Sequence, residues 1–294
     1  MLFPEARRAL EPVADETPVW SDGYDIAAAR DEARASAATE PREDVADVRD
    51  VDADGVPARL YRPAGAAPGL VVHLHGGGFV FHDVDVHDPA ARRLANRTGR
   101  AVLSVDYRRP PEHRFPAAPD DVSTVVGWLD REAAALGVEG PTVVHGDSAG
   151  GNLALVAALR HPGRFVATVL IYPFLDPTAG FASYRTATDG FDPREAAWYW
   201  RQYAAGPADL EHADLAPLRS DRLATLPPTL LVTAEHDPLR DEGEDLAGLL
   251  ADAGVAVTAT RYLGQLHGFW RHASAFPAAE ALLRQSAAFI DQHG

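Results

Sequence analysis

The stretch His145-Gly-Asp-Ser-Ala-Gly-Gly-Asn152 decides the fold, and at its centre Ser148 has a glycine two positions away on each side. An apolar run over residues 141–144 precedes it, and a helix-forming run over 153–159 follows it. Gly-x-Ser-x-Gly between a strand and a helix is a nucleophile elbow, a sharp turn that exposes the serine hydroxyl. The free N–H groups at the start of the following helix would stabilise a negative oxygen beside that hydroxyl. The stretch therefore predicts acyl-transfer chemistry at Ser148.

Length and composition restrict the class of protein. A chain of 294 residues with 46% hydrophobic content fits one large α/β domain with an inserted lid. The net charge of −16 makes nucleic acid and anionic membrane surfaces poor partners. All 27 basic residues are arginines and cysteine is lacking, which excludes Schiff-base lysines, thiolate nucleophiles, disulfides and cysteine-ligated zinc. With no signal-peptide pattern and no apolar run long enough to span a bilayer, we expect a cytoplasmic protein without membrane insertion.

Strand-like and helical runs alternate along most of the chain. A β-hairpin is expected over residues 45–61, because Asp54-Gly55 is a turn dipeptide between two short alternating segments. The later strand candidates are 70–75, 101–105, 142–145, 166–171, 229–233 and 255–261, and helices are expected at 26–34 and near 89–97, 117–136, 149–160, 241–252 and 277–291. This alternation predicts a mostly parallel sheet covered on both faces. Residues 176 to about 215 interrupt it with aromatic, helical sequence, and they are interpreted as an insertion above the sheet.

A serine nucleophile needs a base within hydrogen-bond reach and a carboxylate that orients the base. Such groups are expected just after strands, at the carboxyl edge of a parallel sheet. Asp237 and His267 each follow one of the last two strand candidates, and the order Ser, Asp, His matches a known triad order. The competing residues are Glu235, Asp241 and Asp106 for the carboxylate, and His236 and His272 for the base.

Position in the chain favours one candidate in each case. Glu235 lies closer to its strand, and Asp241 begins the next helix, where an acid suits the helix dipole. His267 lies in a short loop flanked by glycines, free to turn towards Ser148, whereas His272 is expected at the surface. Asp237 and His267 are therefore the predicted partners of Ser148.

Three consecutive glycines follow the first central strand candidate, in His75-Gly-Gly-Gly-Phe79. Glycines have no side chain to pack, so such a run is expected where backbone N–H groups must approach another group closely. It matches an oxyanion-loop motif. The N–H groups of Gly77 and Gly78, with that of Ala149, are the predicted donors to the oxyanion.

The segment 82–88 contains two histidines and three aspartates, a composition that could suggest a metal site. A serine triad leaves no catalytic step that needs a metal. We therefore expect no metal here and interpret the segment as a solvated loop beside the oxyanion loop.

Together these motifs resemble the hormone-sensitive-lipase family of bacterial esterases. The resemblance runs from about residue 50 to the end and rests on residues 75–79, 106–108, 111–113, 115–117, 146–152, 172–173, 237–243 and 267–269. It implies an α/β-hydrolase fold with a helical cap, and carboxylic-ester hydrolysis without a cofactor. It assigns the nucleophile to Ser148, its partners to Asp237 and His267, and the oxyanion donors to Gly77, Gly78 and Ala149. The chain departs from the family pattern at Arg109-Pro110, where Leu-Ala is common, and at Phe79, where Trp is frequent.

The expected organisation is an N-terminal group of cap helices (1–44), a first part of the core (45–175), a cap insertion (176–215) and a second part of the core (216–294). The expected function is hydrolysis of small short- to medium-acyl carboxylic esters. Phe79, Trp198 and Tyr199 are candidates for substrate contact, although aromatic residues at helical spacing often only pack a core. Amide hydrolysis at the same site and a catalytically inactive ligand receptor remain alternatives. The expected partner is a small-molecule ester, and the resemblance leaves a homodimer open.

Overall fold

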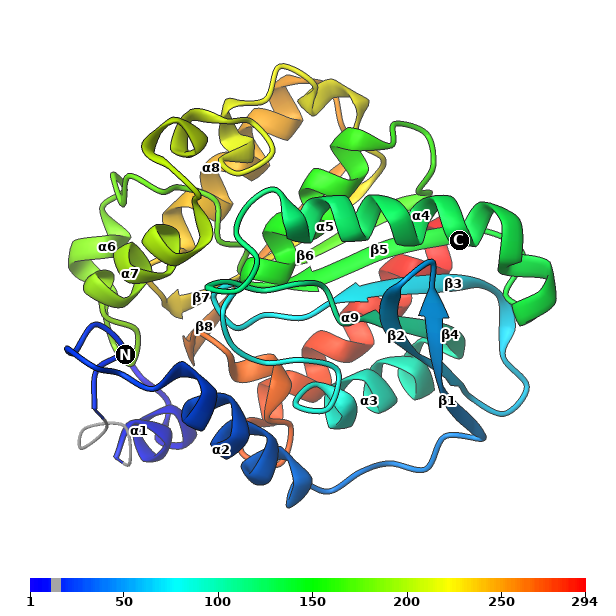
Figure 1. The fold of residues 1–294 in the computed structure, drawn as a ribbon, viewed down its shortest axis with the longest axis horizontal. Coiled ribbons are helices and arrows are strands. Elements are labelled where there is room, and N and C mark those ends of the chain that lie inside the picture. The colour runs from blue at the N-terminus through cyan, green and yellow to red at the C-terminus, as the bar shows by residue number, and fades with distance from the viewer. Residues whose placement is uncertain (12–16) are drawn as a thin grey trace.

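An eight-stranded sheet runs through the centre of the molecule (Figure 1). The structure is a computed structural model and describes residues 1–11 and 17–294. The strands are β1 (Asp47–Ala53), β2 (Val56–Arg62), β3 (Ala67–Leu74), β4 (Arg100–Val105), β5 (Thr142–Asp147), β6 (Ala167–Ile171), β7 (Thr229–His236) and β8 (Val257–Leu266). Their order is β1-β2-β4-β3-β5-β6-β7-β8, with β2 antiparallel to both its neighbours and every other pair parallel. The predicted mostly parallel sheet is confirmed.

The first two strands form the predicted hairpin. Their register runs from the pair Asp47 and Arg62 to the pair Ala53 and Val56. The turn residues Asp54 and Gly55 have φ values of 54° and 90°, which suits a primed turn between twisted strands. The hairpin adds two antiparallel strands to one edge of the parallel sheet.

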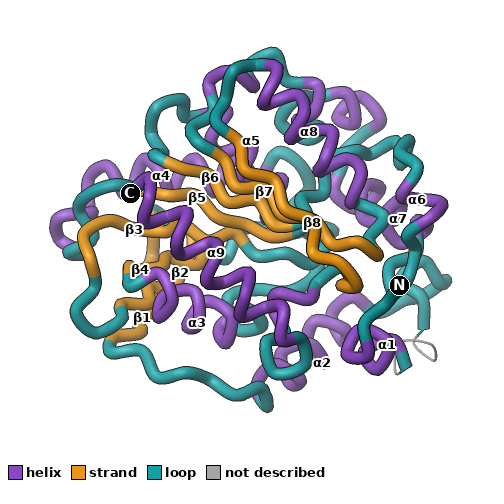
Figure 2. Tube along the Cα trace, turned by 180° about the vertical axis from the view of Figure 1, so that it is seen from behind, coloured by secondary structure: helices purple, strands orange, loops and turns teal. Residues whose placement is uncertain are grey.

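Helices cover both faces of the sheet (Figure 2). One face carries α4 (Ala117–Leu136), α5 (Ala149–Arg160) and α8 (Arg240–Asp252), and the other carries α3 (Asp88–Thr98) and α9 (Pro277–His293). Strand β3 shows how one apolar run supplies two cores. Val72 and Leu74 pack on the α5 side and Val71 packs on the α3 and α9 side, because successive side chains of a strand point to opposite faces.

Three strands, β5, β7 and β8, continue further than the sequence indicates. β5 continues to Asp147, and β8 continues to Leu266, which pairs with His236. A register shift in this pairing and the left-handed Gly264, at φ 70°, mark a bulge inside β8. The glycine therefore bends the strand without ending it.

The remaining helices gather at the edge where β7 and β8 end (Figure 1). They are α1 (Pro4–Leu10), α2 (Ile26–Ala38), α6 (Ser183–Thr186) and α7 (Pro193–Tyr203). The segment 176–215 contains helices and no strand, as predicted. Within the described ranges, no helix is long and apolar enough to cross a bilayer.

Candidate active site

The predicted catalytic residues meet at the carboxyl edge of the sheet. Four parallel strands, β3, β5, β7 and β8, end there, and each is followed within four residues by one of the predicted groups. The glycine run follows β3, Ser148 follows β5, Asp237 follows β7 and His267 follows β8. Parallel strands thus bring together residues that lie far apart in the chain.

Ser148 occupies the strained turn that its flanking glycines predict. Its φ of 55° and ψ of −120° form an unfavourable conformation for a residue with a side chain. A β-carbon on Gly146 would collide with the carbonyl of Gly150, and one on Gly150 would collide with the carbonyl of Leu74. The backbone can fold back at Ser148 only because neither glycine has a side chain.

His267 links the serine to the aspartate. Its Nε2 is 2.9 Å from Ser148 Oγ, and its Nδ1 is 2.8 Å from Asp237 Oδ2. Asp237 is fully buried, and its Oδ1 accepts the N–H of Leu239 at 2.9 Å. A carboxylate at Nδ1 accepts its proton, which leaves Nε2 of the neutral ring as an acceptor facing the serine hydroxyl.

The electrostatic environment of His267 favours the protonated form of its ring. Burial opposes the charged ring, but the charge of Asp237 and its hydrogen bond outweigh burial and raise the pKa of His267 above its ordinary value of 6.5. The base is therefore stronger than an isolated histidine.

The competing residues point elsewhere. Among the carboxylates, Glu235 accepts the N–H of Gly264 at 2.7 Å, Asp241 accepts the N–H of Ser183 and the side chain of Arg240 at 2.8 Å each, and Asp106 lies 3.1 Å from Arg109. Among the histidines, His236 lies 2.8 Å from Asp189 and His272 lies 3.3 Å from Glu40. None of these contacts involves Ser148. The geometry thus favours Asp237 and His267 among the candidates.

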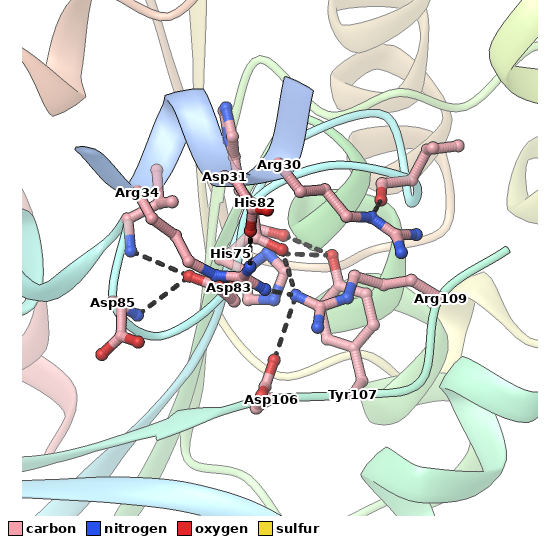
Figure 3. Close-up of polar contacts among 12 residues, drawn as sticks. Arg30, Asp31, Arg34, His75, His82, Asp83, Asp85, Asp106, Tyr107 and Arg109 are labelled. Atoms are coloured by element: carbon pink, nitrogen blue, oxygen red, sulfur yellow. Dashed lines mark hydrogen bonds and ion pairs between the residues drawn. The ribbon is translucent and has the colours of Figure 1, made fainter. Parts of the chain in front are cut away.

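The glycine run approaches its surroundings too closely for side chains. Gly77 and Gly78 have φ values of 115° and 59°, and a β-carbon on Gly78 would enter the ring of Tyr199. The loop begins at a fixed point, because the Tyr107 hydroxyl donates to the carbonyl of His75 at 2.7 Å while the two rings stack (Figure 3). No described residue accepts a hydrogen bond from the N–H of Gly77 or Gly78.

Ala149 is the first residue of α5, so its N–H has no partner inside that helix. It directly follows Ser148, and the positive end of the helix dipole lies at the serine. The backbone around Ser148 is therefore suited to hold a negative oxygen.

Comparisons with known proteins agree with this geometry. A family model described as alpha/beta hydrolase fold matches residues 71–271. The chain belongs to the hormone-sensitive-lipase-like branch of that family. It is 35% identical to an ethyl acetate hydrolase of Pseudomonas putida over 254 residues, covering 82% of this chain and 80% of the relative. It is 40% identical to the carboxylic ester hydrolase LipN of Mycobacterium tuberculosis over 266 residues, covering 83% and 70% respectively.

Solved structures support the same assignment. An esterase of Pyrobaculum calidifontis superimposes with a TM-score of 0.88 at 37% identity and covers 99% of both chains. The resemblance stated from the motifs is confirmed, and the chain is a carboxylic ester hydrolase on an α/β-hydrolase fold.

The hydrolase has a cavity of about 250 Å³ at this site. Ser148, His267, Gly77 and Gly78 line it, as predicted for groups that contact a substrate. Apart from two glycines, sequence reasoning did not find five further lining residues: His82, Asp147, Phe174, Glu195 and Arg271. Phe174 and Arg271 each lie within four residues of a recognised motif, and that proximity was the available signal.

Of the three aromatic residues proposed for substrate contact, Tyr199 lines the cavity. Phe79 is fully buried and stacks on Tyr203 at 3.8 Å between ring centroids. Trp198 stacks on Phe81 at 6.0 Å. Phe79 and Trp198 thus pack among other aromatic rings, outside the cavity lining.

Helix α2 of the esterase is held against the loop that follows the glycines (Figure 3). Arg34 Nε is 2.6 Å from Asp83 Oδ2, and Arg30 donates to backbone carbonyls of this loop and of the segment before Pro111. Arg109 lies between the carboxylates of Asp83 (3.9 Å) and Asp106 (3.1 Å). These arginines connect an N-terminal helix directly to the loop that carries Gly77 and Gly78.

The segment 82–88 is not the solvated loop that its composition indicates. Asp83, His87 and Asp88 are 4%, 0% and 3% exposed. Their burial is possible because the carboxylates have partners, including Arg42 at 2.7 Å from Asp88. Charge pairing therefore overturned the expectation from composition.

Within the described part of the chain, His73, His87 and Asp147 form the one group whose potential metal-ligand atoms lie within 4.8 Å of one another. The histidine nitrogens face each other: His73 Nδ1 is 3.0 Å from His145 Nδ1, and His73 Nε2 is 3.4 Å from His87 Nδ1. Burial lowers the pKa of His73 and His87 well below 6.5, so both rings are neutral. The group is a buried histidine cluster beside the Ser148 turn.

Proposed function

We propose that this esterase hydrolyses small, short- to medium-acyl carboxylic esters through an acyl-enzyme intermediate on Ser148. The observation that carries the proposal is the continuous line from Ser148 Oγ through His267 to Asp237, with contacts of 2.9 and 2.8 Å. Both distances suit hydrogen bonds that prepare a hydroxyl for attack.

In the first half of the reaction, His267 Nε2 takes the proton of Ser148 as the serine oxygen attacks the ester carbonyl. The resulting oxyanion accepts hydrogen bonds from the N–H groups of Gly77, Gly78 and Ala149. One such donor contributes about 3–4 kcal/mol to the transition state. His267 then gives its proton to the departing alcohol.

In the second half, His267 activates a water molecule that attacks the acyl-enzyme and releases the acid. Asp237 stays ionised, holds the ring in one tautomer and stabilises the imidazolium. No step requires a cofactor or a metal.

We further propose that residues 1–44 and 176–215 form a cap over the site, on core segments 45–175 and 216–294. Two observations support this division. Glu195 and Tyr199 of α7 line the cavity beside Ser148, and a second cavity of about 730 Å³ lies between α2 and α7. Differences in these segments would then set substrate preference.

The pH profile tests the role of His267. Because only the neutral ring accepts the serine proton, kcat/KM for a neutral ester should fall about tenfold per pH unit on the acid side and level off above the pKa. Since the pKa of His267 is raised, the midpoint should lie above 6.5. Initial rates of hydrolysis of a neutral chromogenic ester across this range measure it. A flat profile from acid to neutral pH would contradict the assigned base.

The acyl-chain profile tests the substrate class. The cavity is smaller than usual ligand pockets of about 300–1,000 Å³, and Phe174 and Phe191 form part of its wall. We expect kcat/KM to be highest for acetyl to hexanoyl p-nitrophenyl esters and to fall at least about tenfold for lauroyl esters. Phe191→Ala should shift the optimum to longer chains. Equal turnover at all lengths would show that the cavity does not limit the acyl group, and preferential cleavage of matching anilides would favour an amidase.

A further inference from the structure

The cavity is lined by one cationic side chain that the mechanism above does not use. Arg271 lines the cavity of Ser148 and also the larger cavity beneath α2, so it lies at the boundary that the two share. Among the described residues that line either cavity it is the only arginine, and the chain has no lysine. It is therefore the one arginine that the described lining offers to an anionic group of a substrate.

The position of Arg271 is set by the surrounding core. It ends the short 3-10 segment η5 (Phe269–Arg271), in which Phe269 and Trp270 are fully buried. The carbonyl of Arg271 accepts a hydrogen bond from the guanidinium of Arg93 in α3. Its own side chain is 17% exposed. The backbone from which the Arg271 side chain extends is thus held in place before a substrate arrives.

This guanidinium has unused hydrogen-bonding capacity. Its Nη1 is 4.0 Å from Glu40, outside hydrogen-bond distance, and Glu40 is closer to His272, at 3.3 Å. No described residue accepts a hydrogen bond from the Arg271 side chain, which carries five N–H donors in a planar fork. Glu40 lines neither cavity, so it leaves the cavity side of the fork open.

The acidic groups of the cavity differ from Arg271 in this respect. Asp147 accepts the N–H of Gly76 at 3.0 Å, and Glu195 accepts the hydroxyl of Tyr199 at 2.7 Å. Each carboxylate therefore has a donor within the protein. The planar fork of an arginine matches a carboxylate bidentately, and hydrogen bonds between two charged groups are stronger than neutral ones.

We propose that Arg271 binds a free carboxylate on the substrate, so that this enzyme prefers esters that carry a carboxylate close to the reacting carbonyl. The proposal rests on the function proposed above, because the ester group must lie at Ser148. Because Ser148 and Arg271 line the same cavity of about 250 Å³, we expect the carboxylate to lie only a few bonds from the ester carbon. Monoesters of short dicarboxylic acids fit this description, as do esters whose alcohol part carries the carboxylate.

The reaction itself is ordinary ester hydrolysis. The Ser148 oxygen forms a bond to the ester carbon, the bond to the alcohol oxygen breaks, and His267 supplies the proton that the alcohol takes. Water then releases the acyl group, so that a dicarboxylic monoester yields an alcohol and a dicarboxylate. The carboxylate bound at Arg271 is unchanged throughout.

Two matched substrate pairs test the proposal, each at about pH 8, where the free carboxyl group is ionised. Monoethyl succinate is compared with ethyl 4-methylpentanoate, in which an isopropyl group replaces the carboxylate of the acyl part. O-acetylglycolate is compared with isobutyl acetate, which makes the same replacement in the alcohol part. Hydrolysis is followed by release of the alcohol or by titration of acid, and the readout is the ratio of kcat/KM within each pair.

Arg271→Gln removes the charge, and Arg271→Lys keeps the charge but loses the fork. Arg284→Gln is the matched control, since Arg284 lies on α9 with a 76% exposed side chain paired to Glu280. In at least one pair, wild type should hydrolyse the acidic ester at least as efficiently as its neutral partner. Arg271→Gln should lower that ratio about tenfold or more, Arg271→Lys should lower it less, and Arg284→Gln should leave it unchanged.

Each outcome has a distinct meaning. If wild type hydrolyses both neutral esters but hydrolyses both acidic esters about a hundredfold less efficiently, the carboxylate proposal is wrong whether or not the variants fold. The same conclusion follows if the ratio is equal in wild type and a folded Arg271→Gln. If folded wild type hydrolyses no ester of either pair, the proposed esterase function fails instead.

Discussion

Ser148→Ala should abolish ester hydrolysis while leaving the fold intact. Loss of the nucleophile removes the acyl-enzyme route, and kcat for a short-acyl ester should fall at least about 10⁴-fold. The Ser148 hydroxyl contacts His267, and both residues line the cavity. Removal of the hydroxyl therefore leaves His267 accessible to water and leaves no buried polar group unpaired. Steady-state turnover of p-nitrophenyl acetate, with circular dichroism and a thermal melt of the variant, measures both parts of the expectation.

A matched control and a covalent probe sharpen this test. Ser123→Ala removes a serine on α4 whose partners are His161 and Arg160, and its turnover should equal that of wild type. An active-site-directed phosphonate should add one mass increment to wild type and to Ser123→Ala and none to Ser148→Ala. Turnover or labelling that survives in a folded Ser148→Ala would assign the nucleophile to another residue.

Asp237→Asn should lower kcat about 10³- to 10⁴-fold with little change in shape. An amide at this position can donate to Nδ1 of His267, which favours the tautomer whose Nε2 carries the proton and cannot accept that of Ser148. The loss of the negative charge also removes what holds the pKa of His267 above 6.5, while burial, which lowers that pKa, remains. The residual activity should therefore have its acid midpoint at a lower pH than wild type.

The rival carboxylates are the matched controls for this variant. Glu235→Gln and Asp241→Asn alter acids that lie two residues before and four residues after Asp237, and neither contacts His267. Both should keep kcat within about threefold of wild type. A larger loss in either control than in Asp237→Asn would transfer the orienting role to that residue.

Much of this protein is determined locally and can be predicted from the sequence. The turn at Ser148 follows from Gly146 and Gly150, because only residues without a β-carbon fit the close backbone contacts that the structure contains. The hairpin follows from Asp54-Gly55, whose left-handed φ values suit its turn. The alternation of apolar strands and helices predicts the parallel sheet, and the sheet then places residues that follow β5, β7 and β8 at one edge.

Other features depend on contacts between distant parts of the chain. The histidine that faces Ser148 lies 119 residues away from it, and its orientation is set by Asp237 at the end of another strand. Asp83 can be buried because Arg34 of helix α2, 49 residues earlier in the chain, pairs with it. No local pattern encodes such pairing, so composition alone predicted a solvated loop.

By itself, the sequence determined the backbone chemistry of the site: a strained serine, a glycine run without side chains and a helix start, each dictated by steric limits within a few residues. The tertiary structure alone decided which side chains surround that chemistry. Phe79 follows the glycine run directly yet packs in the core, whereas Arg271, outside every motif, lines the cavity. The reason is physical: backbone conformation depends on neighbours in the chain, but the lining of a cavity depends on which distant elements pack around it.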